Sequence, residues 1–175
     1  MLDSAFDLGE ELNNRKIYYY IHIPLWNQFN YPHLSFDFDN WDKIKYLNDL
    51  GTDLSNEIDN VPNNSGGLYI FYVKCKIIPG LTEYPLYIGR AQMTTGQNLR
   101  KRVKEYWQHF RLSNERPKIT RMIKYWGNDL FLAYYPIFDN DQIINLEKDI
   151  INSTLFAMND QIPDKEIKQA ISAFE

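Results

Sequence analysis

The sequence contains a single cysteine, Cys75, among 175 residues. One thiol excludes an intramolecular disulfide and a zinc site built from several cysteines. The chain also lacks a run of 18 apolar residues, which argues against a transmembrane helix. Its acidic, polar beginning does not resemble a secretory signal. We therefore expect a cytoplasmic protein that does not enter a membrane.

Aromatic residues are abundant, at 15% of the chain, and hydrophobic residues make up 44%, which is enough for a well-filled core. The net charge is −4 but is unevenly distributed. Residues 67–135 carry 12 Lys and Arg against 4 Asp and Glu, and nine of these basic residues lie within 98–124. Such a segment can bind a polyanion whatever the net charge. Two ordinary helices with solvated outer faces would give the same composition.

Hydrophobic periods and breaker residues predict the elements of the chain. Strands are expected at 16–24, 68–77, 85–90 and 129–138, and helices at 41–50, 98–111, 118–126, 141–155 and 163–174, the last with Pro163 in its first turn. The second and third strands are close in sequence, with a loop over 79–84, and should form an antiparallel hairpin. Residues 1–15 suit a short acidic helix or a loose arm.

The order of these elements predicts the fold class α+β. After the breaker cluster VPNNSGG at 61–67, the chain runs strand, strand, helix, helix, strand, helix, helix. This order favours a small three-stranded antiparallel sheet flanked by helices, in a main domain over 61–175. Residues 1–60 would be an added N-terminal α/β extension without an assigned role.

Glu147 stands out on the predicted helix 141–155. It lies four residues after Ile143 and four before Ile151, on or beside the inward apolar stripe. Burying a lone carboxylate is costly, so Glu147 must be paired, protonated or bound to a metal. A salt bridge to a buried arginine would satisfy it structurally. An acid/base residue or a ligand for a hard cation is the functional interpretation.

A second group lies on the basic helix 98–111. Arg102, Tyr106 and His109 fall at i, i+4 and i+7, on one face. Arginine can hold a phosphate with two hydrogen bonds, and tyrosine or histidine can relay a proton. The alternative is that Tyr106 packs in the core, Arg102 is a surface charge and His109 is incidental.

Each of two predicted strands carries a tyrosine near a glycine. The tripeptide Gly67-Leu68-Tyr69 lies in the first strand and Tyr87-Ile88-Gly89 in the second, and a basic helix follows. In this order, the chain resembles the GIY-YIG nuclease family, and the resemblance covers about residues 67–160. Further positions that match the family's motifs are Arg90, Arg102, Tyr106, Glu147 and Asn159.

The resemblance implies a metal-dependent endonuclease that hydrolyses DNA phosphodiester bonds with one Mg²⁺ or Mn²⁺ ion. Glu147 would bind the metal and Arg102 would hold the phosphate. Tyr69 would be the general base. Because tyrosine has a reference pKa of about 10, that pKa must be lowered, or the phenol must act in concert with another group. Arg90 could favour the phenolate.

The other matched residues have supporting roles by the same resemblance. Tyr87 would position water or phosphate, and Tyr106 or His109 would assist proton transfer. Asn159 would orient Glu147 or the sheet. The residues expected to contact the DNA, duplex or branched, are Arg100, Lys101, Lys104, His109, Arg111, Lys118, Arg121 and Lys124.

The chain departs from the family pattern in ways that remove no catalytic group. The interval between the two tripeptides is long, and Ala157 replaces the usual proline before Asn159. An extension before a compact catalytic core resembles the small restriction endonucleases of the family. The acidic extension could form a homodimer contact or shield the basic face. The alternatives are a catalytically inactive GIY-YIG-fold module that binds nucleic acid or another partner, and a purely structural domain.

Overall fold

The computed structural model describes residues 4–32, 34, 36–75, 77–78 and 81–174. Within these residues the chain forms one antiparallel sheet with strand order β1-β4-β2-β3. The strands are β1 (Asp42–Lys45), β2 (Gly66–Lys74), β3 (Glu83–Ala91) and β4 (Leu130–Ile137). The α-helices are α1 (Ala5–Asn14), α2 (Ile23–Trp26), α3 (Leu99–Arg111), α4 (Pro117–Trp126), α5 (Asn140–Thr154) and α6 (Lys165–Ser172). The short 3₁₀ segments are η1 (Phe38–Asn40), η2 (Asn56–Asn60) and η3 (Gly127–Asp129).

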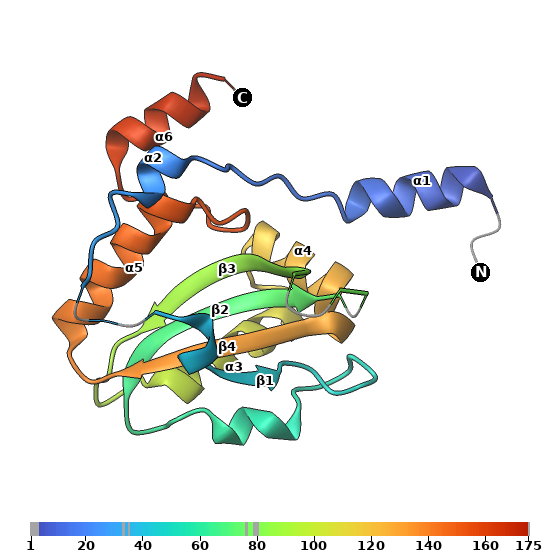
Figure 1. Cartoon of the computed structure of the whole chain (residues 1–175). Coiled ribbons are helices and arrows are strands. Elements are labelled where there is room, and N and C mark those ends of the chain that lie inside the picture. Colours follow the sequence, from blue (N-terminus) through green and yellow to red (C-terminus); the bar gives the residue numbers. More distant parts are fainter. Residues whose placement is uncertain (1–3, 33, 35, 76, 79–80, 175) are drawn as a thin grey trace.

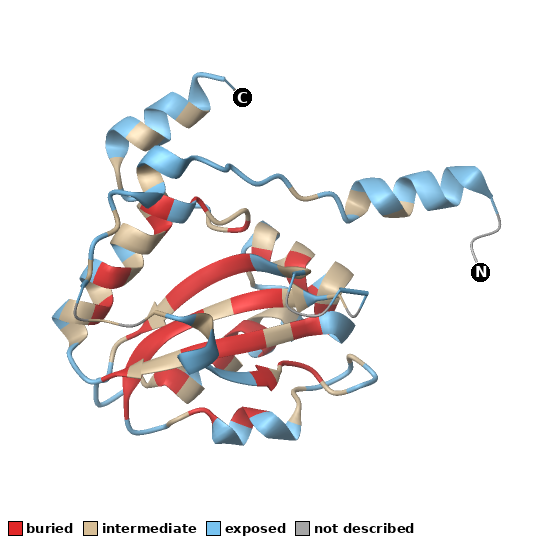
Figure 2. Ribbon diagram, in the orientation of Figure 1, coloured by how far each residue is buried: buried red, intermediate tan, exposed pale blue. Residues whose placement is uncertain are grey.

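Helices lie on both faces of the sheet. Helices α3 and α4 pack against one face and α5 against the other (Figure 1). Because side chains alternate along a strand, Tyr69 and Phe71 of β2 enter the core beneath α3, whereas Leu68 and Tyr72 enter the core beneath α5. Figure 2 shows the buried residues concentrated along the central strands. The α+β class and the antiparallel pairing of β2 with β3 are confirmed.

Helix α3 begins at Leu99, one residue later than the sequence predicts. The Asn98 side chain accepts a hydrogen bond from the Lys101 backbone N–H at 2.9 Å and so caps the first turn. The buried residues of the helix follow one face, at Leu99, Val103, Tyr106 and Trp107. This face holds α3 on the sheet and leaves its flanks free for polar side chains.

The prediction of a three-stranded sheet is wrong, because a fourth strand joins from the N-terminal part of the chain. No helix forms over 41–50, and Asp42–Lys45 within this range form β1, which pairs antiparallel with β4. The spacing of Trp41, Ile44 and Leu47 also suits a helix, so the pattern is ambiguous. The segment becomes a strand because it can pair with the edge of β4. Ile44 and Tyr46, two residues apart, are then both buried in the core, as alternate residues of a strand are.

The predicted strand over 16–24 is also wrong. Residues 16–22 lie outside any strand, and α2 follows them. Aromatic and β-branched residues favour a strand only where an edge is open to them, and the outer edge of β3 is occupied by the segment after α5. Helix α6 is shorter than expected, because Asp164 caps it and Pro163 precedes the cap. The predicted strand 68–77 and loop 79–84 include residues 76, 79 and 80, which lie outside the described part of the chain.

Residues 15–22 form an arm that connects α1, which projects from the body of the protein, to α2 (Figure 1). No residue of α1 is buried. The Arg121 side chain on α4 donates to the carbonyls of Asn14 at 3.0 Å and Lys16 at 2.6 Å, and Arg15 donates to the Tyr125 carbonyl. The arm is therefore held against α4. Among the described helices, none combines the length and apolar character that a membrane crossing requires.

Candidate active site

Three tyrosine hydroxyls meet beneath α3, beside the edge strand β3. The Tyr69 hydroxyl lies 2.8 Å from that of Tyr106, which donates to the Tyr87 hydroxyl at 3.2 Å. Since a phenol carries one proton, Tyr69 is then the donor to Tyr106. The rings pack edge to face, with the Tyr106 centroid 6.0 Å from that of Tyr69 and 5.9 Å from that of Tyr87. We call this continuous series of hydroxyls the tyrosine line.

Burial keeps the two inner phenols neutral. Tyr69 is 0% exposed and Tyr106 is 1% exposed. Burial, and then the charge of Tyr87, raises the pKa of Tyr69 above its ordinary value, although Arg102 acts in the opposite direction. Burial likewise raises the pKa of Tyr106 well above that of an exposed phenol. A base at Tyr69 therefore depends on the second route expected from the sequence, in which another group shares the proton.

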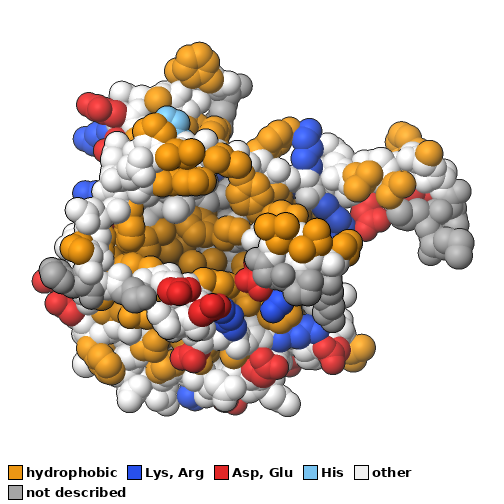
Figure 3. Space-filling model, viewed as in Figure 1, with side chains coloured by type: hydrophobic (Ala, Val, Ile, Leu, Met, Phe, Trp, Pro, Cys, Tyr) orange, Lys and Arg blue, Asp and Glu red, His pale blue; other side chains and the backbone are white. Residues whose placement is uncertain are grey.

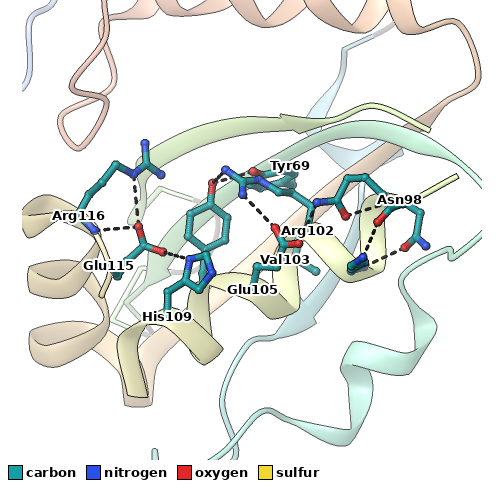
Figure 4. Close-up of polar contacts among 12 residues, drawn as sticks. Tyr69, Asn98, Arg102, Val103, Glu105, His109, Glu115 and Arg116 are labelled. Carbon is teal, nitrogen blue, oxygen red and sulfur yellow. Dashed lines mark hydrogen bonds and ion pairs between the residues drawn. The ribbon is translucent and has the colours of Figure 1, made fainter. Parts of the chain in front are cut away.

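Two guanidinium groups flank the tyrosine line. Arg102 donates to Glu105 at 3.0 Å and to the Tyr106 hydroxyl at 3.4 Å (Figure 4). Arg116 lies in the loop before α4 and donates to the Tyr87 hydroxyl at 3.4 Å. Two donors, Tyr106 and Arg116, therefore converge on the Tyr87 oxygen, and such donors stabilise negative charge on an acceptor.

Arg116 is the site residue that sequence reasoning missed, because it belongs to no motif. The one signal was its position before Pro117, the first residue of α4, where the loop-to-helix junction is rigid. Beside it, the Glu115 side chain is only 6% exposed and pairs with Arg116 at 3.3 Å and with His109 at 3.6 Å (Figure 4). Of the two expected proton-transfer residues, Tyr106 lies on the tyrosine line and His109 contacts Glu115.

Glu147 reaches the edge of β3 from the other face of the sheet. The strand register places Arg90 on the α5 face, where its Nη1 atom donates to Glu147 Oε2 at 2.5 Å. Arg90 therefore pairs with Glu147 and does not support a Tyr69 phenolate as expected. Burial raises the pKa of Glu147, while the charges of Arg90, then Arg102 and Arg116, oppose that shift. A carboxylate that is 17% exposed thus lies within the field of three guanidinium groups.

Glycines in the two tripeptides allow the backbone to approach Tyr69 and the next strand closely. Gly89 is the partner of Tyr69 in the β2–β3 register, and a Cβ at Gly89 would lie 2.5 Å from the Tyr69 hydroxyl oxygen. Gly67 has a φ of 152°, and its Cβ would lie 2.3 Å from the carbonyl oxygen of Tyr135 in β4. Gly89 is therefore needed for the placement of the Tyr69 ring, and Gly67 for the close approach of β2 to β4.

Asn159 holds the sheet and does not contact Glu147 in the described bonds. Its side chain accepts from the Ile88 N–H at 3.0 Å and donates to the Ile88 carbonyl at 2.9 Å. The neighbouring Met158 N–H donates to the Leu86 carbonyl at 2.9 Å. The segment after α5 therefore closes the outer edge of β3 next to Tyr87. Of the two roles expected for Asn159, this geometry fits the one that orients the sheet.

The eight basic residues expected to contact DNA do not form one patch. Arg100 and Lys104 face η2, where Lys104 pairs with Asp59 at 2.9 Å and Arg100 donates to the Asp59 carbonyl at 2.6 Å. Arg121 holds the arm, and Lys118 lies beside the segment after α5. The remaining members of the set are His109, described above, and the exposed Lys101, Arg111 and Lys124.

The donor set around Glu147 bears on the metal that the resemblance implies. Among the described residues, no group of three or more His, Cys, Asp or Glu lies together. Mg²⁺ can be bound by one carboxylate when phosphate oxygens and water complete its shell. The guanidinium groups of Arg90, Arg102 and Arg116 would attract that phosphate. The residues therefore fit an ion that binds together with a phosphate.

The fold and this site define a small α+β protein with a cationic, tyrosine-rich cluster at one edge strand. Known protein families, curated proteins and solved structures were compared with the chain, and none matches it. The function is therefore inferred from the chemistry of the cluster and from the motifs in the sequence.

Proposed function

We propose that the chain is a metal-dependent endonuclease of the GIY-YIG type that hydrolyses phosphodiester bonds in DNA. The observation that carries the proposal has two parts. Three tyrosine hydroxyls meet Arg102 and Arg116 on the α3 side of β3, and Arg90 pairs with Glu147 on its α5 side, where the Glu147 carboxylate also lies within the field of Arg102 and Arg116. These groups come from β2, β3, α3, α5 and the loop before α4. The compact core with an N-terminal extension favours a small restriction-type enzyme within this class.

The guanidinium groups would bind the scissile phosphate. Arg102 donates to the Tyr106 hydroxyl and Arg116 to the Tyr87 hydroxyl. Each guanidinium group has further N–H donors that could bind a phosphate. Their charge would stabilise the extra negative charge of the transition state. Arg90 would act differently, as a positioning residue that orients Glu147.

After one of its hydroxyls has lost its proton to solvent, the tyrosine line would accept the proton of the attacking water. Tyr87 is the member that meets the water in this scheme, because its oxygen receives hydrogen bonds from Tyr106 and Arg116. Tyr69 would support the Tyr87 oxygen from its buried position, because it donates to Tyr106, which in turn donates to Tyr87. The general-base role expected for Tyr69 is therefore distributed over three hydroxyls.

Glu147 would hold Mg²⁺ or Mn²⁺ together with the phosphate oxygens. When bound, the ion supplies positive charge to the phosphate and the leaving oxygen. Arg90 keeps the carboxylate aimed at the edge of β3. Asn159 keeps that edge in place from outside, so that Tyr87 stays next to the phosphate site.

A cleavage assay tests the proposal. The full chain with Mg²⁺ or Mn²⁺ is incubated with supercoiled plasmid, linear duplex, branched DNA and RNA. We expect cuts in DNA that disappear with EDTA and return with excess Mg²⁺, because one carboxylate holds the ion weakly on its own. The cut pattern separates a sequence-specific from a structure-specific enzyme. Binding of DNA without cleavage of any substrate would favour the inactive nucleic-acid-binding module instead.

The pH dependence of cleavage reports on the base. Burial raises the pKa values of Tyr69 and Tyr106, so these two phenols of the tyrosine line stay protonated at neutral pH. The fraction able to accept a proton then grows about tenfold per pH unit between roughly pH 6 and pH 9. We expect the single-turnover rate at saturating metal to rise with that slope. A plateau reached below about pH 8 would contradict a tyrosine base.

A further inference from the structure

A groove of about 760 Å³ lies between the arm, α4, the end of α5 and α6. We call it the arm groove. Two elements that carry residues of the candidate active site, α5 and the start of α4, also line this groove. Ile151, which lines the groove, is one helical turn beyond Glu147 on α5, and Lys118, also in the lining, follows Arg116 by two residues. Asn159, bonded to the edge of β3, lines it as well. The arm groove therefore adjoins the candidate active site at the edge of β3.

The arm groove is cationic. Its lining includes Lys16, Lys118 and Arg121, and none of the described residues that line it is acidic. Asp160, next to the groove, pairs with Lys118 at 3.3 Å, and Arg121 is bonded to the arm. Lys16 is exposed and carries its charge at the mouth. This charge favours a polyanion and disfavours a basic partner surface.

The same groove presents aromatic faces to solvent. Tyr18 is 71% exposed and Phe174 is 94% exposed, while Tyr20 and Phe156 also lie in the lining. The ammonium group of Lys16 lies 5.0 Å from the centroid of the Tyr18 ring. A cation beside an exposed aromatic ring is the arrangement that binds a nucleotide, with the phosphate on the cation and the base on the ring.

The wall formed by the arm is tied to the body of the protein. The Arg121 guanidinium bonds the carbonyls of Asn14 and Lys16, and Arg15 bonds the Tyr125 carbonyl across α4. Tyr18 is thereby kept over the groove although the arm has no sheet partner. Figure 3 shows that hydrophobic side chains also continue over other parts of the surface, including a hollow above the sheet. The arm groove differs from that hollow, which is lined almost entirely by apolar residues such as Phe29, Phe36 and Ile70, because it combines aromatic and cationic side chains.

We propose that the arm groove binds an unpaired nucleic-acid strand that flanks the bond to be cut. This inference rests on the proposed nuclease function and narrows its substrate to DNA with a single-stranded segment beside the cut. Bases in a duplex are stacked on each other and cannot lie on Tyr18 or Phe174, whereas those of a single strand can. The phosphates of the same strand would meet Lys16 and Lys118.

Binding is the first test. Fluorescence anisotropy of the full chain is measured with a short labelled single strand of DNA, the same sequence as RNA, and a blunt duplex. Tyr18→Ala is expected to weaken single-strand binding about tenfold or more, since one base–aromatic stack is lost. Lys16→Ala should reduce the slope of log affinity against log salt by about 0.7. Blunt-duplex binding should not change in either variant.

Two variants serve as matched controls. Lys43→Ala removes a lysine that lies 4.2 Å from the Phe38 ring, on β1 at the opposite edge of the sheet. Phe6→Ala removes an aromatic ring on α1 that is 79% exposed. Both should bind the single strand like the unchanged chain. Equal single-strand affinity of Tyr18→Ala and Phe6→Ala would overturn the proposal.

A cleavage assay separates the arm groove proposal from the proposed nuclease function. The unchanged chain should cut a duplex with a single-stranded flank faster than a blunt duplex, and Tyr18→Ala should lose that preference while it cuts the blunt duplex normally. If both duplexes are cut equally by both proteins, the arm groove proposal fails and the nuclease stands. If nothing is cut but single-strand binding depends on Tyr18 and Lys16, the nuclease fails and the groove assignment stands.

Discussion

Glu147→Gln is expected to reduce metal-dependent cleavage on the order of 10²–10³-fold while DNA binding is retained. The amide keeps the shape of the side chain but has no charge to hold Mg²⁺ or Mn²⁺ beside the phosphate. The guanidinium groups of Arg102 and Arg116 remain, so the affinity for the phosphate backbone should persist. The loss is measured as the single-turnover rate on the preferred substrate, and binding is measured by anisotropy in Ca²⁺ or EDTA.

Glu83→Gln is the matched control for this experiment. Glu83, like Glu147, is a partly exposed carboxylate with a basic partner: its side chain is 22% exposed and pairs with Lys74 at 3.3 Å. It is the first residue of β3, at the end of the strand away from Arg90. Its variant should cleave at the normal rate. Both variants should unfold at temperatures close to that of the unchanged chain, because glutamine keeps the size of the side chain and an oxygen that can accept the hydrogen bond of the basic partner. A Glu147→Gln protein that cleaves as fast as the control would remove the metal-binding role from Glu147.

Gly89→Ala is expected to lower the free energy of unfolding by about 1–3 kcal/mol or more and to abolish cleavage. The new Cβ would lie 2.5 Å from the Tyr69 hydroxyl oxygen and 2.6 Å from its Cζ atom. The ring cannot move aside, because Tyr69 is fully buried and packs against Phe71 and Tyr106. Either the strand shifts or the tyrosine line breaks. Chemical denaturation followed by tryptophan fluorescence measures the loss of stability.

Gly96→Ala provides the corresponding control. A Cβ at Gly96 would meet no atom within 4 Å. This variant should therefore unfold and cleave like the unchanged chain, within about 0.5 kcal/mol. If Gly89→Ala proved as stable as Gly96→Ala, the Tyr69 ring could not lie over Gly89, and the tyrosine line would have to be placed differently.

Most of the central elements could be predicted from the sequence. Helix α3 has a regular apolar face, and β2 is a long run of aromatic and β-branched residues, so their local patterns are unambiguous. The region 41–50 was mispredicted because its apolar spacing suits both a helix and a strand. The arm over 16–22 was mispredicted because its strand-forming residues find no open edge.

The candidate site, too, was predicted from the sequence only in part. The motifs predicted Tyr69, Tyr87 and Glu147 as members, and the structure brings the tyrosines together. Arg116 was missed, since a residue in a loop has no periodic signal. The separation of Arg100 from the rest of the basic segment was also missed, because composition records a charge but not the side of the helix on which it lies.

The sequence by itself determined the residue types, the order of the motifs and the faces of the main elements, because burial follows a helical or strand period that is local to each segment. Only the tertiary structure decided that Arg90 pairs with Glu147, that the hydroxyl of Tyr106 joins those of Tyr69 and Tyr87, and that the arm is held by Arg121. These contacts join residues 19 to 107 positions apart. Partners at such separations depend on strand order and on which edge remains open, and neither is written in any one segment.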